Sequence, residues 1–251
     1  MKKNEEVLIL DTKKIASDTI EMTLQHAQIS KTAKPGQFLH ISVPNRTLRR
    51  PISIAAIDQE KEEIIIIFKI VGKGTLALAN LKPGLTLNVL GPNGSHFDLS
   101  AKENSTILLI GGGVGIPPLY CLGEKLAEKN ITIISILGFQ TEDYVFYEHE
   151  FSQFGQTYVV TNDGSYGEKG YVTDLLNRVE DFDHYYTCGP LPMLQAVTKK
   201  LAHKQGYLSL EEHMGCGIGA CFACVIPTKE PGSYRRICKD GPVFPAEEVS
   251  I

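Results

Sequence analysis

The chain has 251 residues, of which 43% are hydrophobic and 22% are charged. Its formal net charge of −4 argues against a broad nucleic-acid-binding surface. The apolar stretch at residues 7–10 is too short for a signal-peptide core, and no run approaches the roughly 18 apolar residues that a membrane span needs. We therefore expect a cytoplasmic protein that binds neither nucleic acid nor membrane. The length allows two compact domains and a small appendage.

The first hundred residues predict a small antiparallel β-barrel, which we assign to residues 1–101. Strands are predicted at residues 7–10, 19–24, 38–43, 63–71 and 85–90. Residues 19–24 alternate in polarity, as a half-buried strand does, whereas residues 63–71 are apolar enough to be buried on both faces. A single helical stretch is expected at residues 75–81. Several short strands at close spacing are typical of a barrel.

The apolar pattern changes after residue 101 and predicts an α/β domain over residues 102–208. Strands are predicted at residues 106–110, 131–137, 158–161 and 184–188, and helices at residues 117–126, 171–179 and 193–201. Continuous apolar strands that alternate with helices indicate an open parallel sheet with helices on both faces. Two other features receive simple structural interpretations: Cys121 as a small core residue and Asp163 as a turn former.

The most specific motif is a set of four cysteines in the segment 209–251, spaced C-x4-C-x2-C-x13-C. They are Cys216, Cys221, Cys224 and Cys238. This is the plant-type [2Fe–2S] pattern. Gly215, Gly217 and Gly219 permit the positive-φ turns that would point backbone N–H groups inward around a cluster. The segment has little apolar periodicity, so we expect a metal to staple it. A cluster would make the chain a one-electron carrier.

Zinc is the alternative occupant of these thiols. Structural zinc sites usually pair two C-x2-C knuckles, or one knuckle with histidines. Here Cys221 and Cys224 form a single knuckle, and Cys238 stands alone. A zinc-stapled binding module without a redox role therefore stays open as a second class of function.

Two glycine turns indicate a nucleotide site in the α/β domain. The first lies between a strand and a helix and contains Gly111, Gly112, Gly113 and Gly115. It departs from G-x-G-x-x-G because Ile116 occupies the third glycine position. Its glycines would still let a phosphate or ribose approach the backbone at a helix N-terminus. The second turn contains Cys188, Gly189 and Pro190. Both turns should face one crevice, although a tight turn without a ligand is the alternative.

The barrel also carries candidate cofactor contacts. Arg50 can pair with a pyrophosphate, and Ser53 can hydrogen-bond a ring nitrogen. The turn at residues 72–75, Gly-Lys-Gly-Thr, leads into the short helix and suits a phosphate. Taken alone, Arg49 and Arg50 fit a solvated turn better than a cofactor site.

The order of these parts resembles the ferredoxin–NAD(P)+ reductase superfamily, in which the barrel binds FAD and the α/β domain binds the nicotinamide nucleotide. The motifs R-P-x-S, G-K-G-T, GGGVGIPP, T-C-G-P and MGCGIGAC-x2-C narrow the resemblance. From about Leu8 onward the chain resembles the electron-transfer subunits of type B, NAD-dependent dihydroorotate dehydrogenases.

That resemblance implies the residues that contact FAD. They are Arg50, Pro51, Ile52 and Ser53 in the first motif, Ile67, Phe68 and Lys69 in the second, and Gly74 and Thr75 in the third. Ile52 stands where the wider superfamily often covers the flavin with Tyr, so the flavin must be covered differently. The superfamily places a thiol near the nicotinamide ring at the position of Cys188. A buried core role for Cys188 is an equally good interpretation. The four cysteines match the cluster ligands, and the resemblance implies no acid–base catalytic residue.

The same resemblance implies a function. An FMN-containing catalytic subunit would pass electrons from dihydroorotate through the [2Fe–2S] cluster and FAD to NAD+ in pyrimidine biosynthesis, in a heterotetramer with two copies of each chain. The subunit alone would have diaphorase-type activity. The nearest alternative is a subunit of the same architecture serving a sulfhydrogenase or transhydrogenase; the presence of all four cysteines favours the pyrimidine enzyme.

Overall fold

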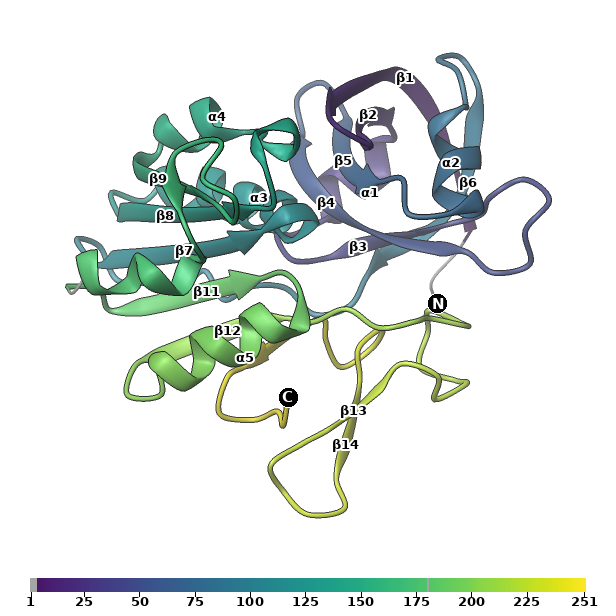
Figure 1. The fold of residues 1–251 in the computed structure, drawn as a ribbon. Helices are drawn as coiled ribbons and strands as arrows, with labels where there is room; N and C mark the ends of the chain where they lie inside the picture. Colours follow the sequence, from purple (N-terminus) through teal and green to yellow (C-terminus); the bar gives the residue numbers. More distant parts are fainter. Residues whose placement is uncertain (1–3, 180) are drawn as a thin grey trace.

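The computed structural model describes residues 4–179 and 181–251 (Figure 1). Six antiparallel strands close a barrel in the order β1-β2-β5-β4-β3-β6, as the sequence predicts. They are β1 (Asn4–Ala16), β2 (Thr19–Gln25), β3 (Phe38–Ile41), β4 (Arg50–Asp58), β5 (Glu63–Lys69) and β6 (Thr86–Asn93). The short helices α1 (Ala27–Thr32) and α2 (Lys73–Ala79) complete this part of the chain.

Strand β5 explains why residues 63–71 are apolar without alternation. Ile64 and Ile66 are fully buried in the core of the barrel. Ile65 and Ile67 point the other way and pack against the core of the α/β part. Because side chains alternate across a strand, a strand covered on both faces must be apolar at successive positions. The predicted burial on both faces is therefore confirmed.

Strand β4 is not among the predicted strands. Its sequence, R-P-I-S-I-A-A-I-D, does not alternate, and proline near its start is unusual inside a sheet. The strand pairs with β3 and β5, and the pairing with β5 contains an irregularity between Ile54 and Ala56. Pairing on both sides, together with packing against helix α3 (Ile116–Ala127), outweighs the weak local signal.

The second sheet has seven strands in the order β10-β9-β8-β7-β11-β12-β15. Its members are β7 (Thr106–Gly112), β8 (Thr132–Phe139), β9 (Gly155–Thr161), β10 (Glu168–Lys169), β11 (His184–Cys188), β12 (Gln205–Ser209) and β15 (Val243–Pro245). All neighbours are parallel except β15, which runs antiparallel to β12. The predicted open parallel sheet is confirmed, with one antiparallel edge strand added from the C-terminal segment.

Helices cover both faces of this sheet (Figure 1). Ile107 and Leu109 of β7 share a core with the leucines of α3, whereas Leu108 and Ile110 share another with α5 (Leu191–Lys200). Helix α4 (Glu148–Ser152) adds its buried Phe151 to the α3 side. Along the residues that the structure describes, no helix has the length and apolar character needed to cross a membrane.

Residues 171–179 do not form the predicted α-helix. They make two short 3₁₀ helices, η3 (Val172–Asp174) and η4 (Leu176–Arg178). The carboxylate of Asp174 accepts a hydrogen bond of 2.8 Å from the backbone N–H of Tyr171. This bond caps the start of η3, as in a capping box. The side chains of Val172, Leu175 and Leu176 are buried in the core shared with α5, and this packing outweighs the local helical signal.

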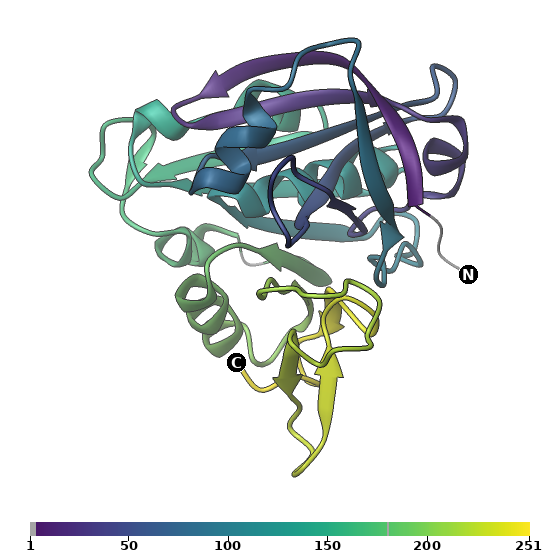
Figure 2. The same cartoon turned by 90° about the vertical axis from the view of Figure 1, so that its right-hand side faces the viewer.

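The C-terminal segment has more order than its sequence suggests. Strands β13 (Val225–Pro227) and β14 (Tyr234–Arg236) form a hairpin that extends away from the rest of the molecule (Figure 2). Strand β15 returns to the central sheet. An apolar cluster that includes Met214, Ile226 and Phe244 packs the segment against the α/β part. Long-range packing therefore holds this segment in addition to any metal.

A hydrogen bond links the barrel to the α/β part. The hydroxyl of Tyr147, beside α4, donates to the carboxylate of Glu21 on β2. Glu21 is 5% exposed and also pairs with Lys13 at 2.8 Å. Burial, and then the bond to Glu21, raises the pKa of Tyr147 above its usual value, so the phenol stays a donor.

We predict that Tyr147→Phe lowers the free energy of unfolding by about 1–2 kcal/mol, because it leaves a buried carboxylate short of one donor. Urea denaturation measures the change. Tyr166→Phe is the matched control, since the hydroxyl of Tyr166 also donates to a carboxylate, that of Glu148, but at an exposed position. That control should change stability by less than about 0.5 kcal/mol. Equal effects of the two substitutions would contradict the assigned role of the buried bond.

Candidate cofactor sites

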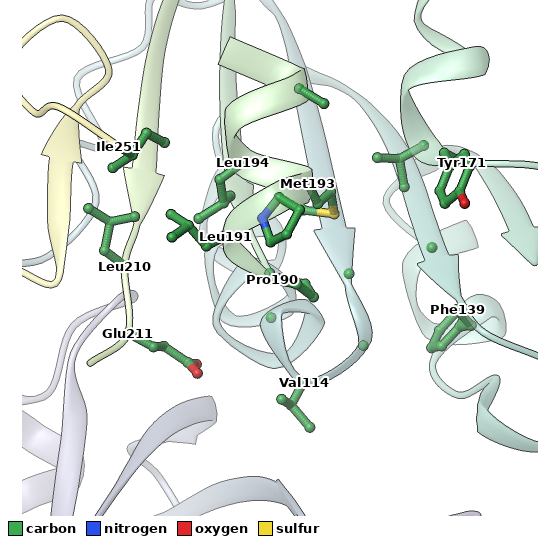
Figure 3. A pocket seen from close by; sticks show the side chains of 18 of the residues that line it. Val114, Phe139, Tyr171, Pro190, Leu191, Met193, Leu194, Leu210, Glu211 and Ile251 are labelled. Carbon is green, nitrogen blue, oxygen red and sulfur yellow. The ribbon is translucent and has the colours of Figure 1, made fainter. Parts of the chain in front are cut away.

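A cavity of about 1120 Å³ opens at the carboxyl ends of the parallel strands (Figure 3). The strand order reverses between β7 and β11, where open α/β sheets bind their ligands. Because Cys188 pairs with Gly111, the two predicted glycine turns lie side by side at this point. Five of the seven predicted nucleotide-site residues line the cavity: Gly112, Gly113, Gly115, Gly189 and Pro190.

The glycines there satisfy two separate constraints. A Cβ atom at Gly115 would collide with the backbone carbonyl of Cys188, so the two turns approach closely only without a side chain. Gly113 has φ +53° and open space on its Cβ side. That space lies at the cavity wall, directly before α3, and leaves room for a nucleotide to approach the backbone. The residues present therefore fit a dinucleotide.

Gly111 and Cys188 lie behind the cavity wall. A Cβ atom at Gly111 would lie 2.7 Å from Cγ1 of Ile116, so this glycine permits close packing of strand against helix. Cys188 is 1% exposed and belongs to the same core as α3. Burial, and then the nearby Glu211 carboxylate, raises the pKa of its thiol. Cys121 is also a core residue, as expected.

The cavity wall also contains residues without a sequence signal. Figure 3 shows Phe139, Tyr171, Met193 and Glu211 around it. Glu211 follows β12, and its exposed side chain lines the cavity. The protein atoms packed around the cavity partly desolvate the carboxyl group, which raises its pKa. Its position depends on the pairing of β12 with β11. A single glutamate in an irregular segment gives no local pattern that could have identified it.

The first and third predicted FAD motifs meet at the start of α2. A Cβ atom at Gly74 would overlap the guanidinium group of Arg50, so a cation lies directly against the first turn of this helix. The hydroxyl of Thr75 accepts hydrogen bonds from the backbone N–H groups of Val71, at 2.9 Å, and Gly72, at 3.3 Å. A guanidinium group beside a helix N-terminus is suited to a phosphate group, so this corner fits the pyrophosphate of FAD.

The remaining barrel residues divide by burial. Ile52, Ile67 and Phe68 are at most 9% exposed and pack into cores, so they can contribute mainly backbone groups to a cofactor. Lys69 differs, because it lines the nucleotide cavity with its Nζ 3.8 Å from the centre of the Tyr144 ring. Pro51 and Ser53 are partly exposed on β4. Lys69 thus connects the second barrel motif to the nucleotide cavity.

The cysteine loop directs backbone N–H groups at sulfur. Cys216 Sγ accepts from the N–H groups of Ala220, at 3.2 Å, and Cys221, at 3.4 Å, and Cys238 Sγ accepts from Gly219 at 3.1 Å. Gly217 and Gly219 have φ of +69° and +82°. Gly215 is not in this region of φ, so the expectation is wrong for that glycine. Inward N–H groups stabilise anionic sulfur, which an iron–sulfur cluster requires.

The four thiols lie as two neighbouring pairs. Hydrogen bonds join Cys216 to Cys221 and Cys224 to Cys238. Within residues 4–179 and 181–251, no three His, Cys, Asp or Glu side chains gather around a point that would hold one metal ion. Two pairs suit a centre with two metals better than the single tetrahedron of structural zinc.

The loop also shifts the pKa values of its thiols in opposite directions. Burial of Cys216 acts against ionisation, but the N–H groups of Ile218, Cys221 and Ala220 together lower the pKa of its thiol to about 6. Burial, and then the bond with Cys224, raises the pKa of Cys238 to about 12. Metal ligands must lose their protons, so the N–H donors around Cys216 favour the form of this thiol that binds metal.

Comparison with known proteins defines the class. Residues 6–97 match the family described as an oxidoreductase FAD-binding domain, and residues 109–199 an oxidoreductase NAD-binding domain. The fold is shared with ferredoxin-NADP+ reductase from Plasmodium falciparum at a TM-score of 0.67 and 19% identity, covering 80% of this chain and 91% of that one. The chain is thus a flavin- and nicotinamide-dependent oxidoreductase of the ferredoxin-reductase fold.

Residues 211–250 match the iron–sulfur cluster binding domain of dihydroorotate dehydrogenase B. The chain is 48% identical to the electron transfer subunit of dihydroorotate dehydrogenase B (NAD(+)) from Bacillus cereus strain B4264, over 100% of both chains. A solved NADH-dependent reduced ferredoxin-NADP oxidoreductase is 34% identical, with a TM-score of 0.87, over 100% of this chain and 91% of that one. This chain belongs to the family of electron transfer subunits of dihydroorotate dehydrogenase B, with FAD, NAD and iron–sulfur domains.

We predict that replacing any one of the four paired cysteines with Ser destabilises or removes the cluster, because an alkoxide substitutes poorly for a thiolate. Iron and sulfide analysis, with EPR of the reduced protein, measures the loss. Cys121→Ala should retain two irons per chain, since Cys121 is buried in the barrel core. Full iron content and an unchanged EPR signal in Cys238→Ser would refute the four-ligand assignment.

Proposed function

We propose that this chain carries electrons from a separate, FMN-containing dihydroorotate dehydrogenase subunit to NAD+. The name of its relatives supports this reaction. The matches to FAD-binding, NAD-binding and iron–sulfur domains account for the three cofactors that the reaction requires in this chain. FAD, when bound, links the one-electron chemistry of the cluster to the two-electron chemistry of NAD+. We further propose a cytoplasmic heterotetramer with two copies of each chain.

The protein's own residues would bind and orient these groups. We propose that Arg50 and the turn around Gly74 hold the FAD phosphates, that the turns of Gly113 and Gly189 hold NAD, and that the paired thiols hold the cluster. We assign residues 1–101, 102–208 and 209–251 to these three tasks. The observation that carries the proposal is the cavity that the second barrel motif shares with both glycine turns, because transfer between flavin and nicotinamide requires the two groups to meet.

The cluster loop is the surface that we propose for the catalytic subunit. Ile218 is 50% exposed and Phe222 is 62% exposed, and both flank the exposed Cys221. Adjacent exposed apolar side chains are typical of a protein interface. A cluster in this position would exchange electrons over a short distance with a partner docked here.

We expect the acceptor to be NAD+ rather than NADP+. The end of β8 and the turn that follows it, residues 138–143, carry Glu142 and Asp143 and no cation. An NADP site would place Arg or Lys near the 2′-phosphate. In a dye-reduction assay, kcat/KM for NADH should exceed that for NADPH by at least tenfold. Gln140→Arg, which adds a cation at the cavity wall, should improve the value for NADPH. Comparable values for the two nucleotides with the unmodified chain would refute this expectation.

The partnership has its own test. The isolated chain should oxidise NADH with artificial dyes but show no turnover of dihydroorotate with NAD+. Addition of the catalytic chain should restore that reaction. Turnover by the isolated chain, or failure of the two chains to bind, would contradict the proposal.

Two matched substitutions locate the interface. Ile218→Glu should weaken the complex in size-exclusion chromatography while the cluster EPR signal stays. Leu85→Glu, at a 48% exposed position in the barrel, is the control and should leave the complex intact.

A further inference from the structure

His40 is a buried histidine without a partner. It lies on β3 and is 0% exposed, and neither ring nitrogen has a hydrogen-bond partner among the residues that the structure describes. Burial, then the charges of Arg49 and Arg50, lower its pKa to about 4. The ring is therefore neutral at pH 7, with one N–H donor and one acceptor. A buried donor is normally satisfied, so its partner must be a group that the protein atoms alone do not supply.

The position of His40 connects two cofactor sites. It pairs directly with Pro51 of the first FAD motif. Its neighbours Leu39 and Ile41 point into the barrel, so alternation directs His40 outward. Phe38, which shares that outward face, belongs to the core of the cluster segment. The imidazole therefore lies between the FAD-binding strands and the cysteine loop.

On its outer side the ring lies against Gly217, next to the ligand Cys216. A Cβ atom at Gly217 would overlap Nδ1 of His40 and lie 2.9 Å from its Cε1. Gly217 thus needs to be glycine for this contact as well as for its φ of +69°. The NAD cavity offers no alternative partner, because His40 is not among the described residues that line it.

We propose that His40 is a positioning residue for the cluster: its ring holds Gly217 against the FAD-binding strands, and its N–H donates a hydrogen bond to a sulfur of the bound cluster. This inference rests on the proposed [2Fe–2S] assignment of the cysteine loop. Hydrogen bonds to cluster sulfurs stabilise the reduced state and raise the reduction potential. His40 would thereby set how readily the cluster exchanges electrons with the flavin.

Redox titration of the cofactor-loaded chain, followed by EPR, tests the donor. His40→Leu keeps the ring's approximate volume without a donor, and should make the cluster about tenfold harder to reduce relative to a fixed mediator, a shift of about −59 mV. His40→Gln, which retains an N–H donor, should restore most of the potential. The matched control is His184→Leu, because His184 also has a buried ring nitrogen without a partner among the described residues. His184 begins β11, at the end of the parallel strands away from the cavity and the cysteine loop. An unchanged potential in His40→Leu, or an equal shift in the control, would overturn the proposal.

A second measurement does not depend on any variant of His40 retaining its cluster. Pulsed EPR of the reduced protein labelled with ¹⁵N-histidine should show coupling between the cluster spin and an imidazole nitrogen. The coupling should persist in His213→Gln, which removes the histidine nearest to Cys216 in the sequence. A cluster signal without ¹⁵N coupling, or coupling lost in His213→Gln, would refute the role proposed for His40 but leave the proposed function of the chain standing. No cluster signal at all would refute the proposed function with it.

Discussion

The stabilisation of negative sulfur by backbone N–H groups is the interaction on which the rest of this molecule depends. Four thiolates in one short segment repel one another unless the loop supplies compensating dipoles. Ala220 and Gly219 donate to sulfur from positions that the positive-φ glycines make possible. Arg236 supports this loop by donating to the carbonyl of Gly219 at 3.1 Å and pairing with Asp240. Backbone donors and the Arg236 contact together direct this loop toward its sulfur atoms.

The fold places this loop beside the other two sites through long-range pairing. Strand β15 attaches the C-terminal segment to β12, and Phe38 of the barrel packs into the same apolar cluster as Cys224 and Cys238. Strand β5 serves two cores at once, which fixes the barrel against the α/β part. These shared cores hold the barrel, the α/β part and the cysteine loop against one another.

The parts that could be predicted from the sequence are those with local signals. The cysteine spacing, the glycine turns after apolar strands and the helix of Leu119 and Leu122 all follow from neighbouring residues. The apolar run in β5 indicated burial on two faces because its residue types leave no polar face. The expected turn at Asp163 is also found. It follows from a local contact, because the carboxylate of Asp163 accepts a hydrogen bond of 3.0 Å from the N–H of Ser165, two residues on.

The remaining features depend on partners distant in the chain. Strand β4 needs β3 and β5, Glu211 reaches the cavity through the pairing of β12, and the contact of His40 with Gly217 joins residues far apart in sequence. The predicted helix at residues 171–179 is replaced by two 3₁₀ helices whose apolar side chains pack into a core shared with α5. None of these leaves a periodic pattern.

The most direct test of the central claim is anaerobic addition of NADH to the purified chain, followed by absorption and EPR spectroscopy. If the chain conducts electrons between nicotinamide and cluster, the flavin absorbance should bleach and the EPR signal of a reduced [2Fe–2S] cluster should appear without any other protein. A bleached flavin with no cluster signal, or a colourless protein that contains zinc, would contradict the account.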